Sequence, residues 1–279
     1  MSIKITTLIE NMPDEKGRLA YEHGFSVFVE ADGKRLLFDT GQSGAFVKNA
    51  EGLGIDLGKL DAVILSHGHY DHTGGVPALL EQLNKKTPFY IGKEFFKKKY
   101  KRLEDGSWKY NGIPFSGKIL TEAGGMAGLQ VVAEDVTRLS KNIVLFKNFS
   151  RVTDFEEVNR NFFVEEETYV QDLFRDEIAL GLLTEDGVVL VAGCSHVGIV
   201  NMLAHVKRVL QKPVAAVVGG THLVEADGTR LAKTVEAFRF YGVKRIAVSH
   251  CTGEAGMELL KKEFPEEFVL NNTGTVMEF

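Results

Sequence analysis

The sequence predicts an α/β protein folded as a four-layer αββα sandwich with two similar β-rich halves. Apolar runs flank two Asp-Gly turns, Asp32-Gly33 and Asp186-Gly187, as they do in β-hairpins. A short apolar strand follows each hairpin, and both the turn and the strand recur after 154 residues. Helical periodicity lies between strands. Two such sheets can bury their inner faces against each other and carry helices on their outer faces.

The first half begins with a hairpin whose strands are expected over 25–30 and 35–39. The run DAVILS at 61–66 is rich in β-branched residues, which indicates a strand buried on both faces. The apolar residues that follow have the i, i+3, i+4, i+7 spacing of an amphipathic helix. They are Val76, Leu79, Leu80 and Leu83.

The second half repeats this order, with hairpin strands at 178–184 and 188–193 and later strands at 215–222 and 245–249. No linker rich in Pro, Gly or Ser separates the halves, so we expect a single domain over 1–279. The segment at about 92–176 interrupts the symmetry, and we expect it to be an inserted, lid-like segment. In it, the spacing of Phe96, Tyr100 and Leu103 predicts a helix. The basic run at 93–102 either gathers an anionic substrate or forms a solvated helix face.

Composition narrows the function classes. Hydrophobic residues make up 44% and charged residues 25%, which is typical of a soluble globular protein. Membrane spans need ~20 apolar residues, longer than any run here, and the first residues lack a secretion signal. The net charge of −5 disfavours nucleic-acid binding. The two cysteines suit a reducing compartment. We therefore expect a cytoplasmic protein with a small-molecule substrate and neither nucleic-acid nor membrane partners; its oligomeric state is left open.

A cluster of metal-ligand residue types follows the strand at 61–66. Three of the eight histidines and one carboxylate fall within six residues: His67, His69, Asp71 and His72. Neutral imidazoles and carboxylates bind divalent transition ions. His67 and His69 can hold one ion, and Asp71 and His72 a second. The alternative is a surface histidine cluster without metal, which would crowd these groups without purpose.

Other strand ends offer further ligands. His196 and His250 each follow a predicted strand, as His67 does, although a hydrogen-bonded structural histidine is the alternative for both. Cys194 either binds or bridges metals as a thiolate or is a small buried hydrophobic residue. Asp39 either accepts a ring N–H from a ligand histidine or simply forms a turn.

These motifs resemble a known superfamily. Phe38-Asp39-Thr40-Gly41 and the stretch at 66–75 are similar to the signature of metallo-β-lactamase-fold hydrolases. Motifs at 21–24, 151–156, 193–201, 219–223 and 249–253 resemble a subgroup that includes proteins named 7,8-dihydropterin-6-methyl-4-(β-D-ribofuranosyl)aminobenzene-5′-phosphate synthase. The resemblance implies a one- or two-metal centre at the strand ends. It places metal ligands at His67, His69, Asp71, His72 and His250 and a pocket contact at His23; His222 is either a substrate contact or a core residue.

The chain departs from the superfamily pattern twice. The superfamily has a ligand histidine between the first motif and the next strand, but residues 73–195 contain no histidine. Either His196 or Asp176 supplies this ligand, or one metal site is weak. The superfamily also commonly bridges its metals with an aspartate where this sequence has Cys194.

The leading hypothesis is a metal-dependent hydrolase of a small anionic substrate that bears phosphate. One or two Zn²⁺ ions, with Fe or Mn as alternatives, would lower the pKa of bound water from 15.7 to about 7. The metal-bound hydroxide would attack the substrate, and Asp71 would orient the water or accept its proton. One alternative is a pterin-dependent synthase that condenses a dihydropterin pyrophosphate with a ribofuranosylaminobenzene phosphate. Another is a non-catalytic sensor that binds a metal or ligand.

Overall fold

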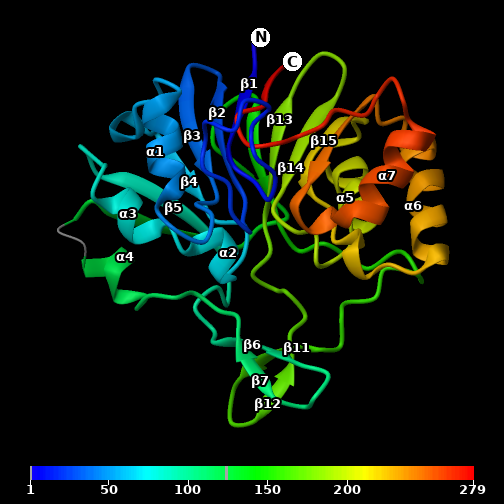
Figure 1. The fold of residues 1–279 in the computed structure, drawn as a ribbon, viewed down its shortest axis with the longest axis horizontal. Coiled ribbons are helices and arrows are strands. Elements are labelled where there is room, and N and C mark those ends of the chain that lie inside the picture. The colour runs from blue at the N-terminus through cyan, green and yellow to red at the C-terminus, as the bar shows by residue number, and fades with distance from the viewer. Residues whose placement is uncertain (1, 123–124) are drawn as a thin grey trace.

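The computed structural model describes residues 2–122 and 125–279, and two large β-sheets lie face to face at its centre (Figure 1). The first sheet has the strand order β17-β1-β2-β3-β4-β5-β8. Its strands are β1 Lys4–Ile9, β2 Ser26–Ala31, β3 Lys34–Phe38, β4 Ala62–Ile64, β5 Thr87–Gly92, β8 Ala127–Val132 and β17 Val276–Glu278. The second has the order β16-β15-β14-β13-β10-β9. Its strands are β9 Val136–Arg138, β10 Ile143–Phe146, β13 Ala179–Leu183, β14 Val188–Ala192, β15 Val214–Gly220 and β16 Arg245–Ser249.

Helices cover the outer face of each sheet, as Figure 1 shows. On the first sheet they are α1 Ala45–Gly52, α3 Val76–Leu80 and α4 Lys118–Glu122, and the short α2 Tyr70–Thr73 follows β4. On the second they are α5 Ile199–Leu210, α6 Gly228–Tyr241 and α7 Gly253–Glu263. Short 3₁₀ turns cover Leu57–Lys59, Leu223–Glu225 and His250–Thr252. The four-layer αββα fold class is therefore confirmed.

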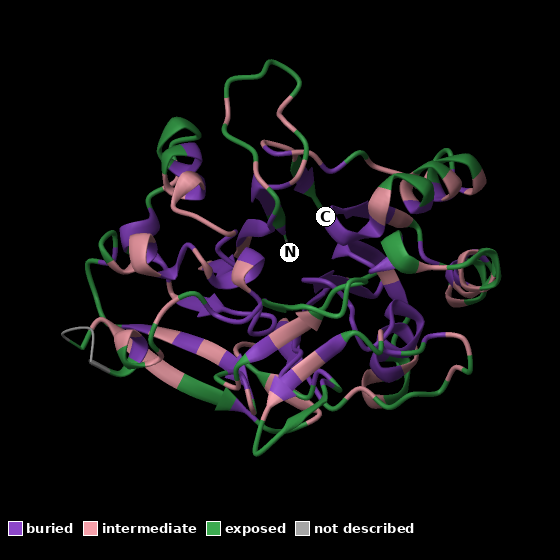
Figure 2. Ribbon diagram, turned by 60° about the horizontal axis from the view of Figure 1, so that its bottom comes forward, coloured by how far each residue is buried: buried purple, intermediate pink, exposed green. Residues whose placement is uncertain are grey.

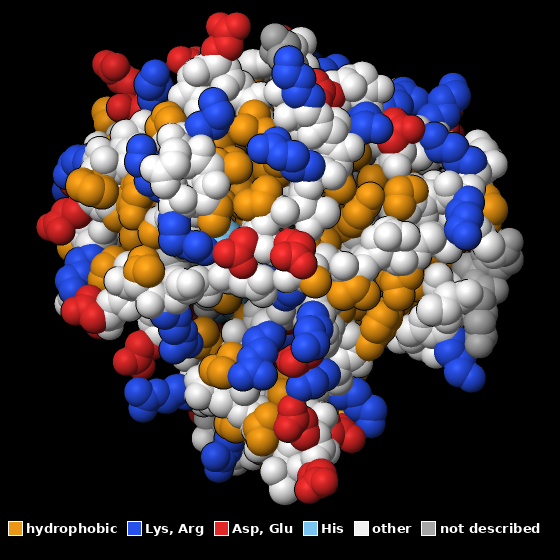
Figure 3. All heavy atoms as spheres, turned by 180° about the vertical axis from the view of Figure 1, so that it is seen from behind, with side chains coloured by type: hydrophobic (Ala, Val, Ile, Leu, Met, Phe, Trp, Pro, Cys, Tyr) orange, Lys and Arg blue, Asp and Glu red, His pale blue; other side chains and the backbone are white. Residues whose placement is uncertain are grey.

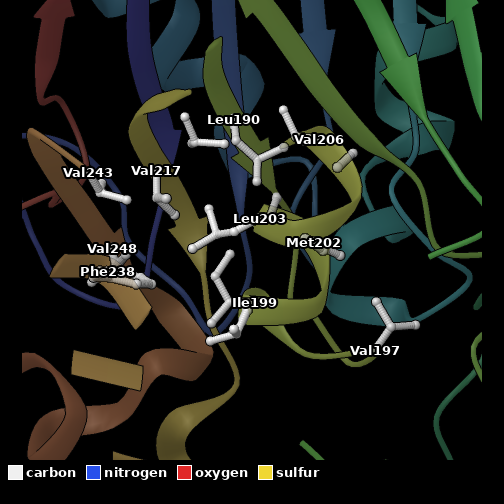
Figure 4. Close-up of a cluster of buried hydrophobic side chains, with 14 of the residues drawn as sticks. Leu190, Val197, Ile199, Met202, Leu203, Val206, Val217, Phe238, Val243 and Val248 are labelled. Carbon is white, nitrogen blue, oxygen red and sulfur yellow. The ribbon is translucent and has the colours of Figure 1, made fainter. Parts of the chain in front are cut away.

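Alternation along the strands divides the interior into three apolar layers, and the central strands are almost wholly buried (Figure 2). Val27 and Val189 point into the layer between the sheets, whereas the neighbouring Phe28 and Leu190 point toward the helices. Successive residues of a strand face opposite sides, so strands covered on both faces must be apolar throughout. Figure 4 shows Leu203 of α5 against Leu190 in the outer layer of the second sheet.

The two halves share one topology. In the first, the antiparallel hairpin β2–β3 is followed by β4 and β5, each parallel to the strand before it. In the second, the hairpin β13–β14 is followed in the same way by β15 and β16. Asp32 and Gly33 form the first turn with φ of 53° and 70°, the positive values that a two-residue hairpin turn requires. The hairpins and strands predicted at a constant offset are therefore confirmed.

The segment at 92–176 is divided in the structure. β8 belongs to the first large sheet, and β9 and β10 belong to the second. The other strands form a third, four-stranded sheet: β6 Lys99–Arg102, β7 Trp108–Tyr110, β11 Phe162–Glu165 and β12 Tyr169–Gln171. We call this small sheet the arm. It projects from one end of the molecule (Figure 1), and Figure 3 shows Lys and Arg side chains beside hydrophobic ones on it. Its role as a lid stays a prediction.

The predicted helix through Phe96, Tyr100 and Leu103 is wrong, because Tyr100 lies in β6 and pairs with Phe163 of β11. The amphipathic helix predicted from Val76 to Leu83 is present but shorter than its apolar spacing suggests. α3 ends at Leu80, and Leu83 is buried just beyond it. Among residues 2–122 and 125–279, no helix has both the length and the apolar character that crossing a bilayer requires.

Candidate metal centre

The candidate centre lies where parallel strands of both large sheets end. The chain leaves β4 through His67, Gly68 and His69, and α2 then carries Asp71 and His72. The loop after β14 carries Cys194 and His196, and the turn after β16 begins at His250. Carboxyl ends of parallel strands meet at one edge of a sheet, where ligand sites are common in open α/β sheets. Two such edges face each other here, so residues distant in sequence come together.

Three histidines form the first ligand group. The Nε2 atoms of His67, His69 and His196 are buried and have no hydrogen-bond partner among the residues that the structure describes. Each residue offers a ligand atom within 4.8 Å of the others. Burial lowers the pKa of all three rings well below 6.5, so they are neutral at neutral pH with a free lone pair. Unpartnered buried nitrogens are costly, and a divalent cation bound by all three would satisfy them.

A second group surrounds Asp71. Its Oδ2 lies 3.3 Å from Nε2 of His250 and 3.7 Å from Nε2 of His72. The two histidine Nε2 atoms are 3.2 Å apart. Such close nitrogens need a cation between them or a proton on one. Burial lowers the pKa of His72, but Asp39 and Asp71 outweigh it and raise the value to about 9. A metal in this group would therefore displace a proton from His72.

Asp39 orients ligands of both groups. Its Oδ2 accepts a hydrogen bond from Nδ1 of His72 at 2.7 Å and another from the hydroxyl of Ser66 at 2.7 Å. Because the Ser66 hydroxyl donates to Asp39, its oxygen accepts from Nδ1 of His67 at 2.9 Å. These partners hold one ring proton on Nδ1 of each histidine, so Nε2 is the atom that each ring offers to a metal. The structure thus gives Asp39 the contacts expected of a residue that fixes ligand tautomers.

Asn11 contacts ring nitrogens of two further histidines of the centre. Its Oδ1 accepts from Nδ1 of His250 at 2.9 Å, and its Nδ2 lies 3.4 Å from Nδ1 of His23. His23 can then donate from Nε2 to Oδ2 of Asp71, 3.2 Å away. Burial raises the pKa of Asp71, but His72 and the hydrogen bonds from His23 and His250 hold it well below its usual range. The His23 side chain is 52% exposed, which marks the open side of the centre.

Cys194 lies between the two groups. Its Sγ is 3.1 Å from Nε2 of His72, and a ligand set of His67, His72 and Cys194 falls within 4.8 Å. Burial raises the pKa of this thiol, so in the metal-free protein it stays protonated. A metal ion would favour the thiolate, which can bridge two ions.

Asp176 does not supply a ligand in any of these groups. Its Oδ2 accepts the Gly68 N–H at 2.7 Å, and its Oδ1 lies 2.9 Å from Nζ of the buried Lys99. His196 is the residue that the structure places with His67 and His69. The neighbouring Glu177 fixes the His196 backbone, because its carboxylate accepts the N–H groups of His196 and Val197 at 2.9 Å each.

Aromatic rings from the arm and from the loop after it cover the first group. Phe162 of β11 stacks on His69 at a centroid distance of 5.4 Å. Phe174 stacks on His196 at 3.8 Å with an interplanar angle of 10°. These rings hold the imidazole planes and exclude water from one side of the histidines. No sequence pattern predicted a role in the site for either residue, nor for Ser66, Asn11 and Glu177, because no local pattern marks a residue that acts on a distant ligand.

His222 lies beside the first group, with its ring 4.3 Å from that of His196. Its Nε2 is 3.1 Å from Oε2 of Glu225, and its Nδ1 is buried without a partner among the described residues. Of the predicted site residues, the ligand candidates, Asp39 and His23 thus lie in one centre and His222 at its edge. Their roles stay predictions.

Comparisons with known proteins identify relatives of similar sequence and similar fold. The model of the family described as "Metallo-beta-lactamase superfamily" matches residues 21–144. A Methanocaldococcus jannaschii protein named "7,8-dihydropterin-6-methyl-4-(beta-D-ribofuranosyl)-aminobenzene-5'-phosphate synthase" is 31% identical over 291 residues, covering 100% of this chain and 97% of that protein. A crystal structure titled as a metal-dependent hydrolase of the beta-lactamase superfamily matches with a TM-score of 0.84 and 33% identity, covering 99% of both chains. The fold is also similar to that of YhfI from Bacillus subtilis, with a TM-score of 0.62, 15% identity and 100% of both chains covered.

Proposed function

The chain belongs to the metallo-β-lactamase superfamily, and from this premise we propose that it is a metal-dependent hydrolase of a small, phosphate-bearing substrate. The observation that carries the proposal is the convergence of the unpartnered Nε2 atoms of His67, His69 and His196 in a buried site. Asp71, His72 and His250 form an adjacent group, with Cys194 within reach of both. One or two zinc ions suit these nitrogen, sulfur and carboxylate donors, with iron or manganese as alternatives.

Ions bound here would supply Lewis-acid polarisation of a phosphoryl oxygen and lower the pKa of water. The chain's own residues prepare the site. Asp39 contacts Nδ1 of His72 directly and Nδ1 of His67 through Ser66, so both rings offer Nε2 to the metal site. Asp71 stays ionised at neutral pH and can accept a proton at Oδ2. His23, half exposed and 3.2 Å from that oxygen, lies between Asp71 and solvent.

Charges near the open side support an anionic substrate. Nζ of Lys109 lies 5.7 Å from the ring centre of Tyr70, the residue between His69 and Asp71. Nζ of Lys101 lies 5.1 Å from the ring centre of Phe162, which covers His69. Cations in these positions can raise the local concentration of a phosphate ester. The proposed substrate is a small molecule, and the proposal includes neither a nucleic-acid nor a membrane partner.

The second candidate is a pterin-dependent synthase, and the full-length similarity to the M. jannaschii synthase favours it. In that reaction a dihydropterin pyrophosphate would condense with a ribofuranosylaminobenzene phosphate and release pyrophosphate. The same ligand groups would then assist departure of the pyrophosphate anion. A non-catalytic sensor is the third candidate and requires binding without turnover.

A metal-dependent turnover assay distinguishes these functions. Protein stripped of metal and reloaded with zinc, iron or manganese is offered phosphomonoesters, phosphodiesters, pyrophosphates, lactones and thioesters, and the synthase substrate pair. A hydrolase releases product from one substrate alone. A synthase releases pyrophosphate only when both substrates of the pair are present. Tight ligand binding without any product identifies a sensor and contradicts both enzymatic proposals.

The matched variants are His69→Ala and His205→Gln. His205 is also a buried histidine, but it lies in α5 and bonds to the carbonyl of Asp135, away from the ligand groups. We expect His69→Ala to lose bound metal and turnover together, and His205→Gln to keep both. Full metal retention in His69→Ala would refute the ligand assignment.

A further inference from the structure

A third group of metal-ligand residues lies beside the centre, and two of its three members, His222 and Cys251, take no part in the proposed function. Cys194, His222 and Cys251 each offer a ligand atom, and these atoms lie within 4.8 Å of one another. All three residues are buried, with exposed fractions of 3%, 8% and 8%. Neither cysteine is in a disulfide. From these observations we propose that this group binds an additional thiophilic metal ion, with Cys194 shared with the neighbouring centre.

The His222 ring is arranged to offer Nδ1 to this group. Its Nε2 lies 3.1 Å from the Glu225 carboxylate, which can only accept, so the ring proton is on Nε2. Lys101 holds Glu225 in place from the arm with an ion pair of 3.1 Å. Nδ1 is therefore the ring nitrogen left to face the two sulfur atoms, and it is buried without a hydrogen-bond partner among the described residues. A buried, unpartnered nitrogen beside two sulfur atoms suits a cation bound between them.

The two loops that carry His222 and Cys251 are clamped together. The Thr252 hydroxyl oxygen accepts from the Thr221 hydroxyl at 3.0 Å and lies 3.3 Å from the Thr221 backbone nitrogen. His222 itself has a left-handed backbone with φ of 48°, a costly conformation that these contacts maintain. Sγ of Cys251 lies 3.4 Å from the carbonyl oxygen of Cys194. The donors are therefore held near one another by the fold without any ion.

The packing leaves no room for larger side chains around the sulfur atoms. A Cβ added at Gly220 would lie 2.6 Å from Sγ of Cys251 and 3.2 Å from Cα of Cys194. Gly220 ends β15, so the glycine lets the loops after β14 and β16 approach each other across that strand. This close approach brings the two cysteines, 57 positions apart in sequence, to one point.

Two thiolates and one imidazole form a soft donor set. Such sets select Zn²⁺, Cd²⁺ or Cu⁺ over Mn²⁺ and Mg²⁺, which prefer oxygen ligands. Binding of a divalent ion would release to solvent the protons that Cys194, Cys251 and Nδ1 of His222 carry, and would leave both sulfurs as thiolates. Because Sγ of Cys194 also lies 3.1 Å from Nε2 of His72, its thiolate would bridge the additional ion and the main centre.

The test counts metals of two kinds in the full-length protein. Reduced, metal-free protein is loaded with Cd²⁺ or with Mn²⁺, freed of excess ions and analysed for metal per chain, with cobalt–thiolate absorbance recorded in parallel. We expect one more Cd²⁺ than Mn²⁺ per wild-type chain. In Cys251→Ala this extra Cd²⁺ should be lost. The cobalt–thiolate absorbance of the Co²⁺-loaded protein should fall, while the part that comes from Cys194 in the main centre remains.

Two further variants make the result specific. His222→Gln removes the imidazole and should weaken retention of the extra ion without changing the Mn²⁺ count. Thr234→Ala alters a buried side chain of α6 in the same half and should behave as wild type. Equal Cd²⁺ and Mn²⁺ counts in the wild type, or an unchanged extra ion in Cys251→Ala, would overturn the proposal. So would a Cys194–Cys251 disulfide that forms in air while Cd²⁺ is bound at its full count. None of these results would contradict metal binding by the other two groups, on which the proposed function rests.

Discussion

Individual residues at the strand ends adopt costly backbone conformations. Asp39, Ser195, His222 and His250 all have positive φ values between 48° and 59°. A left-handed backbone at a residue other than glycine costs roughly 1–3 kcal/mol and persists only where surrounding contacts enforce it. Each of these residues follows a parallel strand that ends at the candidate centre. The strain is thus concentrated where side chains from both sheets must converge.

Asp39 provides a direct test of how ligand orientation affects metal binding. In Asp39→Asn one of the two accepting oxygens becomes an NH₂ group. The side chain then cannot keep both the Ser66 N–H bond now made to Oδ1 and the bonds from His72 and the Ser66 hydroxyl now made to Oδ2, so the His72 ring is held less firmly. We expect metal affinity to fall by about 10- to 100-fold. Competition with a chromogenic chelator measures this.

Asp61→Asn is the matched control, because Asp61 also accepts a backbone N–H in the first sheet but lies outside the centre. We expect its metal affinity to equal that of the wild type. Equal affinity in Asp39→Asn would instead show that Asp39 has only a structural role.

We expect the buried His205, which is not a candidate metal ligand, to make the free energy of unfolding depend on pH. Burial lowers its pKa below 6.5, and Arg208 contributes in the same direction. The full contribution of His205 to the free energy of unfolding is therefore present above pH 6.5. As the pH falls toward the lowered pKa of the folded state, this contribution is lost, because the unfolded chain takes up the proton first. In His205→Gln this loss is absent.

The measurement is the free energy of unfolding in urea from pH 7.5 to pH 5 for both proteins without metal. We expect the stability advantage of the wild type over His205→Gln to shrink as the pH falls. A difference that stays constant across this range would contradict the pKa direction.

At the level of elements, a buried ionic cluster joins the arm to the metal-binding loop. Lys99 of β6 is 2% exposed, and its Nζ lies 2.5 Å from Asp172 and 2.9 Å from Asp176. Asp176 also accepts the Gly68 N–H between His67 and His69. The position of the arm and the conformation of that loop are therefore linked through one lysine.

Lys99→Met should be strongly destabilising, because it leaves two buried carboxylates without their cation. We expect a loss of about 3–5 kcal/mol in the free energy of unfolding. Lys98→Met removes the adjacent, exposed lysine, which pairs with Glu165 at the surface, and should change stability by about 0–1 kcal/mol. Urea denaturation of both variants measures the contrast. Similar losses in the two variants would show that the cluster adds no stability.

Contacts with residues distant in sequence also explain why the helix predicted in the basic run does not form. The apolar spacing of this run is compatible with a helix. However, Tyr100 packs on Tyr110 and Tyr169 in the arm. The buried Lys99 forms ion pairs with two aspartates that are more than 70 positions away. Strand pairing and a distant ion pair outweigh local spacing. No pattern within this segment could have indicated either contact.

At the scale of the whole molecule, the two halves depend on each other through the layer between the sheets. Leu180 of β13 lies fully buried in this layer, together with Val27 and Phe38 of the opposite sheet. We expect Leu180→Ala to lower the free energy of unfolding by about 2–5 kcal/mol. The exposed Leu270→Ala should stay within about 0.5 kcal/mol of the wild type. Unfolding followed by circular dichroism measures both, and a small loss in Leu180→Ala would show that the sheets pack loosely.

The sequence alone determined the layered fold, the repeated hairpins and the ligand motif from His67 to His72. These features follow from short-range rules: strand alternation, turn chemistry and the spacing of ligands on one loop. Only the tertiary structure decided that His196 joins His67 and His69, that Asp176 holds the loop through Gly68 and Lys99, and that Cys251 meets Cys194. Those contacts depend on how two sheet edges face each other, and the free energy that brings them together comes from burial of apolar surface far from the site.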